Sequence, residues 1–263
     1  MKTLAIVNLK GGVGKTVSAA NMAHILAVYH HKKVLLVDGD KQGSASRYFG
    51  VYGEQDGTAM LLLGPGPGAP GIDQLIYRTG CKGLDIITSN MDLYSTDREL
   101  YEDSANTSGV LAEALGGVQD DYDFCIIDNG PSVDMVTLNV LAAADDVLIP
   151  IRPDVFSFSG LLDLVEQVDS VREAINPGLT LRGAFFTHWQ NRETFWQARR
   201  SLEDSGICPV FQTAIGYNPK VPESTLEEMP LCAFAPRSWA AIQYKKLTAE
   251  YLALTDSGKG KEG

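Results

Sequence analysis

A glycine-rich loop between a strand-like run and a helical pattern constrains this chain more than any other feature. The apolar run Leu4-Ala5-Ile6-Val7 precedes Lys10-Gly11-Gly12-Val13-Gly14-Lys15-Thr16, and helical periodicity follows from Ser18 to Ala27. The order strand, loop, helix gathers backbone N–H groups at the positive end of a helix dipole, where glycines leave room for a phosphate. A chance glycine turn would explain neither the strand before the loop nor the helix after it. We therefore predict a nucleotide phosphate site.

Each loop residue has an expected role in such a site. Lys15 reaches the β- and γ-phosphates, and the Thr16 hydroxyl ligates Mg²⁺. The predicted nucleotide-binding residues from the loop are Gly11, Gly12, Val13, Gly14, Lys15, Thr16 and Val17.

Short apolar runs alternate with helical patterns along the rest of the chain. This alternation predicts an α/β fold with a doubly wound, mostly parallel sheet and helices on both faces, and the glycine loop after the first strand makes it resemble a P-loop NTPase. The predicted strands are Leu4–Asn8, Val34–Asp38, Leu84–Thr88, Phe124–Asp128, Val147–Ile151, Leu181–Phe186 and Val210–Thr213. The helices expected after the first are Asp92–Glu102, Ser108–Leu115, Ser159–Ile175 and one that ends near Leu254.

The length of 263 residues, 44% of them hydrophobic, suits one domain with a sizeable core. The Gly/Pro-rich residues 64–71 predict an exposed loop inside that domain, because too little chain precedes them for a separate core. We place the domain at residues 1–255 and predict that the polar residues 256–263 form a disordered tail.

Composition excludes several classes of protein. No apolar run is long enough to span a membrane, and Met1-Lys2-Thr3 leads directly into a strand, so we expect a cytoplasmic protein without a signal peptide or membrane contact. The four cysteines are dispersed, which predicts reduced thiols rather than disulfides or a metal cluster. With a net charge of −11, any DNA contact requires a local basic patch and would be strongly salt-sensitive.

Two acidic elements follow later strands. Asp38 and Asp40 end the run that begins at Val34, at the sheet edge where α/β proteins bind ligands. We predict that Asp38 faces the Mg²⁺ shell and that Asp40 orients or deprotonates the attacking water. Without the glycine loop, a turn with solvated acids would explain these two residues equally well. Asp128 ends another apolar strand in the manner of a Walker B aspartate on Mg²⁺, and Asn129-Gly130-Pro131 then forces a turn able to respond to the γ-phosphate.

Together these three elements resemble the ParA/MinD family of deviant Walker ATPases, whose loop is KGGxGKT. The discriminating residue is Lys10. The resemblance implies that Lys10 binds nucleotide across a dimer interface, so that ATP and Mg²⁺ assemble a homodimer, with Lys10, Lys15 and Asp40 as catalytic residues. It also implies that Thr213-Ala214-Ile215 and Lys220-Val221-Pro222-Glu223-Ser224 lie near the adenine.

The chain departs from the family pattern at three positions. Lys41 stands where D-x-D-P-Q-G has proline, which would loosen the turn and add positive charge near the phosphates. Val17 replaces a frequent second threonine, and Tyr217 stands where many partition ATPases have an arginine implicated in DNA binding.

Other features select a branch of the family. The chain begins at its first strand, without a helix-turn-helix extension, so we do not expect site-specific repression. Its last helix lacks a bulky basic amphipathic end for a membrane, and its cysteines do not fall where the nitrogenase iron protein ligates a cluster. The resemblance therefore favours the Soj-type partition branch.

A local basic patch follows the Leu181–Phe186 strand. Arg192, Arg199 and Arg200 share helical spacing with Trp196, and Lys220 is a further candidate for phosphate contacts. A solvated helix with its aromatic side chains in the core explains the composition equally well, and the resemblance favours DNA.

The hypothesis is a nucleoid-associated partition ATPase that binds double-stranded DNA non-specifically and moves a plasmid, mobile element or chromosome region with a ParB-like adaptor. The alternative is an ATP-switched positioning factor for a protein cargo or membrane-associated machine, without DNA binding. A metabolic kinase or ligase would leave Lys10 and the D-x-D element unexplained.

Overall fold

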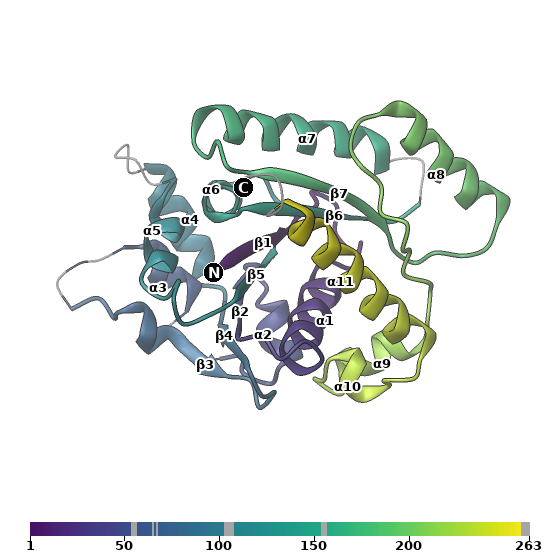
Figure 1. Cartoon of the computed structure of the whole chain (residues 1–263). Coiled ribbons are helices and arrows are strands. Elements are labelled where there is room, and N and C mark those ends of the chain that lie inside the picture. Colours follow the sequence, from purple (N-terminus) through teal and green to yellow (C-terminus); the bar gives the residue numbers. More distant parts are fainter. Residues whose placement is uncertain (54–56, 65, 67, 103–107, 154–156, 259–263) are drawn as a thin grey trace.

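In the described part of the chain, seven strands form one sheet with helices on both faces (Figure 1). The computed structural model describes residues 1–53, 57–64, 66, 68–102, 108–153 and 157–258. The strand order is β3-β4-β2-β5-β1-β6-β7, and neighbouring strands are parallel except for β3 against β4. The strands are β1 (Lys2–Ile6), β2 (Val34–Gly39), β3 (Ile76–Arg78), β4 (Leu84–Ile87), β5 (Phe124–Asn129), β6 (Asp146–Ile151) and β7 (Thr180–Phe186). The predicted fold class is confirmed.

One predicted strand does not form, and one strand of the structure was not predicted. Val210–Thr213 does not form a strand, and Val210 makes only an isolated bridge to Ala184. Beyond this bridge, side chains make the backbone hydrogen bonds that a neighbouring strand would make. Glu250 accepts the N–H groups of Gln212 and Thr213, and Arg199 donates to the carbonyls of Phe211 and Gln212. Strand β3 was not predicted, because three residues at a sheet edge carry too short a pattern.

The helices divide into two layers, each with its own buried cluster. The cluster on one face includes Leu61, Leu111, Val136 and Leu164, and the cluster on the other face is built mainly from α1, α2, α10 and α11. The helices are α1 (Lys15–Val28), α2 (Ser44–Tyr48), α3 (Thr58–Leu62), η1 (Ile72–Leu75), α4 (Leu93–Glu102), α5 (Val110–Gly116), α6 (Met135–Ala143), α7 (Ser157–Ala174), α8 (Glu193–Ser205), α9 (Lys220–Leu226), α10 (Leu231–Phe234) and α11 (Trp239–Gly258).

Helix α11 packs beside α1 and runs further than expected (Figure 1). It continues to Gly258, so residues 256–258 of the predicted tail belong to this helix, and residues 259–263 lie outside the described residues. Its buried side chains include Tyr244 and Tyr251, and the Tyr244 hydroxyl lies 3.2 Å from Ser18 Oγ of α1.

No helix in the described part of the chain combines the length and the apolar character that crossing a membrane requires. The four cysteines are free thiols.

Candidate active site

The glycine loop connects β1 to α1 at the carboxyl edge of the sheet, next to β5. Gly12 and Gly14 have φ angles of 70° and 88°, which side chains rarely adopt. A Cβ added at Gly11 or Gly12 would meet nothing within 4 Å, so the space in front of the loop is open. Thr187 Oγ1, just beyond β7, donates to the Val13 carbonyl at 2.8 Å and fixes the loop from behind. These features fit a phosphate cradle.

Lys15 is buried at the start of α1, and its Nζ donates to the Lys10 carbonyl at 3.0 Å. Burial lowers the pKa of this ammonium, and the Asp128 and Asp40 carboxylates oppose that decrease. The electrostatic influence of both aspartates shows that the three predicted elements converge on one point. A lysine held in this way is ready to bind a phosphate without a large rearrangement.

Asp38 lies at the end of β2, directly opposite Asp128 of β5 in the sheet register. It is fully buried, which raises its pKa to about 6. Ser46 donates to Oδ2 from its backbone N–H at 2.8 Å and from its hydroxyl at 2.7 Å, and Asp40 N donates to Oδ1 at 3.1 Å. Three donors therefore already occupy this carboxylate.

Asp128 is also fully buried, but neither of its carboxylate oxygens has a hydrogen-bond partner of good geometry among the described residues. Burial and then the Asp38 carboxylate raise its pKa well above the usual range, and only the nearby Thr16 hydroxyl and the Lys15 charge favour the ionised form. A buried carboxylate without donors beside a hydroxyl suits Mg²⁺, which prefers oxygen ligands and keeps several waters. Thr16 and Asp128 thus fit the predicted metal site.

Asp40 lies half-buried in the turn after β2, with Oδ1 accepting the Gln42 N–H at 3.0 Å. A Cβ placed on Gly130 would lie 3.5 Å from this oxygen, so the Asp40 carboxylate packs against the turn that follows Asp128. Strands β2 and β5 approach closely here, since a Cβ on Gly39 would lie only 2.9 Å from the Asp128 carbonyl.

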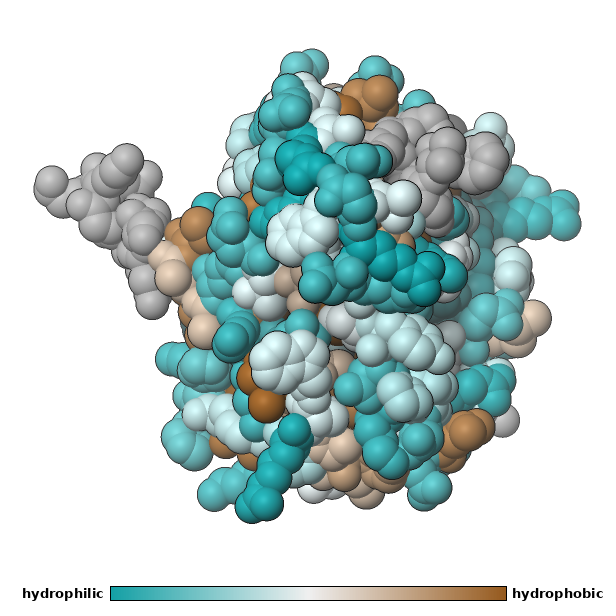
Figure 2. Space-filling view, turned by 90° about the vertical axis from the view of Figure 1, so that its right-hand side faces the viewer, coloured by the Kyte–Doolittle hydropathy of each residue, from teal (hydrophilic) through white to brown (hydrophobic). Residues whose placement is uncertain are grey.

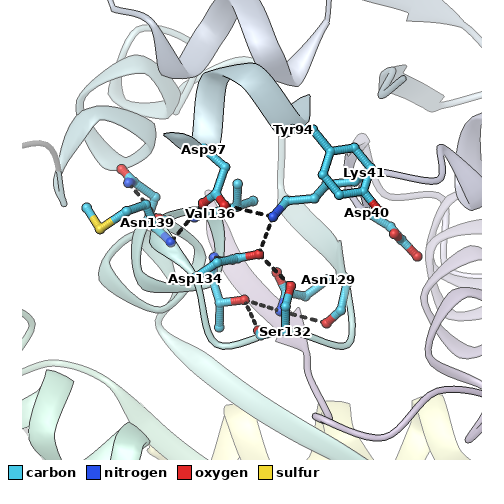
Figure 3. Close-up of polar contacts among 12 residues, drawn as sticks. Asp40, Lys41, Tyr94, Asp97, Asn129, Ser132, Asp134, Val136 and Asn139 are labelled. Atoms are coloured by element: carbon cyan, nitrogen blue, oxygen red, sulfur yellow. Dashed lines mark hydrogen bonds and ion pairs between the residues drawn. The ribbon is translucent and has the colours of Figure 1, made fainter. Parts of the chain in front are cut away.

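Lys41 does not point toward the phosphate loop, contrary to the charge predicted there. Its Nζ lies 2.8 Å from Asp97 Oδ2 on α4 and 2.7 Å from Asp134 Oδ2 before α6 (Figure 3). Figure 3 also shows the Asp40 side chain directed away from this cluster. The predicted positive charge is therefore matched by two carboxylates. Sequence reasoning did not assign a role to either aspartate.

A cavity of about 340 Å³ adjoins the glycine loop. Gly12, Gly14 and Val17 line it from the loop and the start of α1, and the rest of its lining includes Ile215 and residues 216–218, 221, 222 and 225. The two stretches predicted near the adenine therefore line a cavity of suitable place and size for a nucleoside. Thr187 and His188 also line it and were not predicted, although polar residues directly after a parallel strand are a usable signal. Tyr217, discussed above only as a DNA position, lines it as well.

The predicted DNA residues do not form one free basic surface. Arg199 is buried and donates to the Phe211 carbonyl at 3.0 Å and to Glu203 at 2.8 Å, so it is not part of an exposed basic surface, contrary to the patch predicted from helical spacing. Arg200 pairs with Glu193 and Lys220 pairs with Glu223, each at 2.5 Å, while Arg192 is exposed at the start of α8. Hydrophilic residues cover most of the face that carries α8 and α9, with apolar ones scattered among them (Figure 2).

Comparison with known proteins agrees with this geometry. The model of the AAA domain family matches residues 1–181. The chromosome-partitioning ATPase Soj of Treponema pallidum is 36% identical over 257 residues, which cover 96% of this chain and 97% of that protein. The chain belongs to the ParA/MinD family of P-loop ATPases.

Two further proteins are similar to this chain over most of their length. The chromosome partitioning protein ParA of Caulobacter vibrioides is 31% identical over 258 residues, covering 96% of this chain and 94% of that protein. A solved structure titled cobyrinic acid a,c-diamide synthase from Mycobacterium smegmatis, with a bound ATP analogue and magnesium, has a TM-score of 0.85 and 28% identity, covering 98% and 97% of the two chains. The present chain is accordingly an ATPase that uses ATP and Mg²⁺.

Proposed function

We propose that this ATPase is a partition ATPase of the Soj type, which dimerises with ATP, binds DNA non-specifically and releases it after hydrolysis. The observation that carries this proposal is the match to chromosome-partitioning ATPases along almost their whole length, in a chain whose loop has Lys10 before the glycines. A ParB-like adaptor on a plasmid, mobile element or chromosome region would stimulate turnover. The protein would act in the cytoplasm, at the nucleoid.

The residues of the site have distinct roles in this proposal. The backbone N–H groups of residues 11–16 and the Lys15 ammonium hold the phosphates, while Lys10 reaches the nucleotide of the second subunit. Thr16 and Asp128 would hold Mg²⁺, which neutralises charge on the β- and γ-phosphates when bound.

Asp38 and Asp40 have different tasks. Three donors already bind Asp38, so we propose that it orders the turn after β2 instead of ligating the metal directly. Asp40, which precedes Lys41 and packs on Gly130, orients the attacking water.

The proposed DNA surface consists of Arg192, Arg200 and Lys220. Arg200 and Lys220 each pair with an exposed glutamate, and exposed ion pairs of this kind are worth only about 0–1 kcal/mol, so DNA phosphates can replace the glutamates at small cost. Each phosphate contact lowers the affinity for DNA as salt rises, and three contacts predict a slope of log K against log salt of about −3 per subunit.

The ion pairs of Arg200 and Lys220 also support the second candidate, an ATP-switched positioning factor for a protein cargo. A glutamate offsets the charge of each of these two side chains, the net charge of the chain is −11, and Tyr217 supplies no positive charge. Such a protein would keep the nucleotide-dependent dimer but would not bind DNA.

The test combines light scattering after size exclusion with DNA binding at low and high salt, in ATP and Mg²⁺, for wild type, Lys10→Ala and Asp40→Ala. The partition proposal expects an ATP-dependent dimer, its loss in Lys10→Ala, and a long-lived, DNA-bound dimer in Asp40→Ala. A dimer with no salt-sensitive DNA binding would overturn it in favour of the protein-cargo function. A monomer under all conditions would overturn the proposed nucleotide switch itself, and phosphate transfer to a small acceptor would indicate a metabolic enzyme.

A further inference from the structure

Lys41 is held by two carboxylates from different elements in a largely buried position. Its side chain is 15% exposed, and those of Asp97 and Asp134 are 19% and 13% exposed. The Tyr94 ring lies with its centroid 5.2 Å from Lys41 Nζ and covers the cluster from α4. Because these groups are shielded from water, their ion pairs are stronger than typical surface pairs.

Both carboxylates also bind the first turn of α6. Asp134 Oδ1 accepts the Thr137 N–H at 2.9 Å, as an N-cap residue does, and Asp97 Oδ1 accepts the N–H groups of Met135 at 3.0 Å and Val136 at 3.3 Å. Lys41 therefore connects the turn after β2 to the N-terminus of α6 and to α4 at the same time.

The α6 N-terminus is in turn tied to the end of β5. Thr137 Oγ1 donates to the Ser132 carbonyl at 2.6 Å and accepts from Asn129 Nδ2 at 2.9 Å (Figure 3). Asn129 directly follows Asp128, so the turn of residues 130–134 is closed by side chains at both ends. Asp40 lies against Gly130 in this turn, one residue before Lys41.

Proline at position 41, as in the D-x-D-P-Q-G pattern, would stiffen the turn by fixing its own φ angle. In this chain the restraint comes instead from a side chain that reaches across to another element. The hydrogen bonds from Lys41 and Ser132 hold the pKa of Asp134 below its usual range, although burial opposes this, so Asp134 is ionised and binds Lys41 at neutral pH.

We propose that Lys41 is a positioning residue for ATP hydrolysis, whose ion pairs to Asp97 and Asp134 hold the Asp40 carboxylate in place beside the turn of residues 130–134. This inference rests on the proposed role of Asp40 in orienting water. Lys41 itself contacts neither nucleotide nor metal in this role. A loosened turn would misplace Asp40 by a fraction of an ångström to an ångström, which is enough to slow a reaction that depends on alignment.

The test compares kcat and KM for ATP in Lys41→Met, Lys41→Arg and Asp40→Asn, with Arg98→Met as control because Arg98 of α4 makes an exposed pair with Glu102 beside Asp97. We expect Lys41→Met to lower kcat about 10- to 100-fold with KM changed less than about threefold. Lys41→Arg can bridge both carboxylates and should restore kcat to within about threefold of wild type. Arg98→Met should match wild type.

A double-mutant cycle separates positioning from general structural damage. In the Asp40→Asn background, Lys41→Met should cause no further loss of kcat, because no carboxylate remains to be positioned. An equal loss in both backgrounds would show that Lys41 acts independently of Asp40 and would overturn the inference, as would wild-type kcat in Lys41→Met. Lys41→Gln, which keeps polar groups near both carboxylates, replaces the methionine variant if that variant does not fold. Wild-type kcat in Asp40→Asn would instead refute the proposed role of Asp40.

Discussion

Asp38 and Asp128 stand opposite each other at the ends of two paired strands, yet among the described residues only Asp38 has hydrogen-bond donors of good geometry. Ser46 and the Asp40 N–H occupy Asp38, whereas the Asp128 oxygens are buried without good partners among the described residues. Two adjacent buried carboxylates repel each other, and burial raises the pKa of both. The two carboxylates therefore repel each other in the nucleotide-free site, and we expect a divalent cation bound there to offset this repulsion.

Asp128→Asn should abolish Mg²⁺-dependent hydrolysis, with a loss in kcat of about 100-fold or more, because an amide binds Mg²⁺ more weakly than a carboxylate. The same change should raise the melting temperature of the nucleotide-free protein, since it removes a buried acidic group that Asp38 repels and that has no well-placed donor among the described residues. Calorimetry and phosphate release measure the two effects. Asp121→Asn, at an exposed position before β5, is the control. A lower melting temperature of the Asp128→Asn protein would contradict the repulsion between Asp38 and Asp128.

Stability should depend on pH through the same pair. The pKa of Asp38 is raised to about 6 in the folded protein from an ordinary value of 3.8, so the folded state binds the proton more tightly. The resulting stabilisation is fully present below about pH 4 and is lost as pH rises through about 6. Mg²⁺ held at Asp128 would favour the ionised form of the neighbouring Asp38, so Mg²⁺·ADP should raise the melting temperature more at pH 7.5 than at pH 5. An equal increase at both pH values would argue against metal binding beside Asp38.

Gly43→Ala should destabilise the protein by about 2–4 kcal/mol, the sum of left-handed strain and overpacking. Gly43 has a φ angle of 61°, and an added Cβ would collide with the Ser89 carbonyl and the Tyr52 ring. Gly71→Ala is the matched control, because its φ is −68° and a Cβ there meets nothing within 4 Å. Urea unfolding of both variants checks this, and equal stabilities would refute the close approach.

Replacing Arg199 should lower stability, whereas replacing the adjacent Arg200 should affect DNA binding and leave stability almost unchanged. Arg199→Ala removes buried bonds to backbone carbonyls and should cost about 2–4 kcal/mol of unfolding free energy. Arg200→Ala should change stability by less than about 0.5 kcal/mol and, if DNA binds here, should reduce the salt slope of DNA binding by about 1. Denaturation and salt titration separate the two roles. A stable Arg199→Ala protein with impaired DNA binding would restore Arg199 to the interface.

The parts of the fold and of the candidate site that could be predicted depend on residues close together in the sequence. The glycine loop, Asp40 and Asp128 follow strands whose apolar runs are visible in the chain, and parallel strands bring their carboxyl ends to one edge whatever the details of packing. The two stretches expected near the adenine were predicted through family resemblance. Strand β3 and the segment at Val210 were missed because edge pairing and side-chain bonds to Glu250 and Arg199 are not local properties.

The sequence by itself thus determined the fold class, the phosphate loop and the carboxylates at the sheet edge, because each depends on residues within one short segment. Only the tertiary structure decided which carboxylate lacks well-placed donors among the described residues, since two of the donors to Asp38 come from Ser46 on the following helix. It also decided that Arg199 is internal and that Lys41 turns to Asp97 and Asp134, which are 56 and 93 residues away. The sequence gives the charge of each side chain, but the packing of elements distant in the sequence determines which residue forms an ion pair with it.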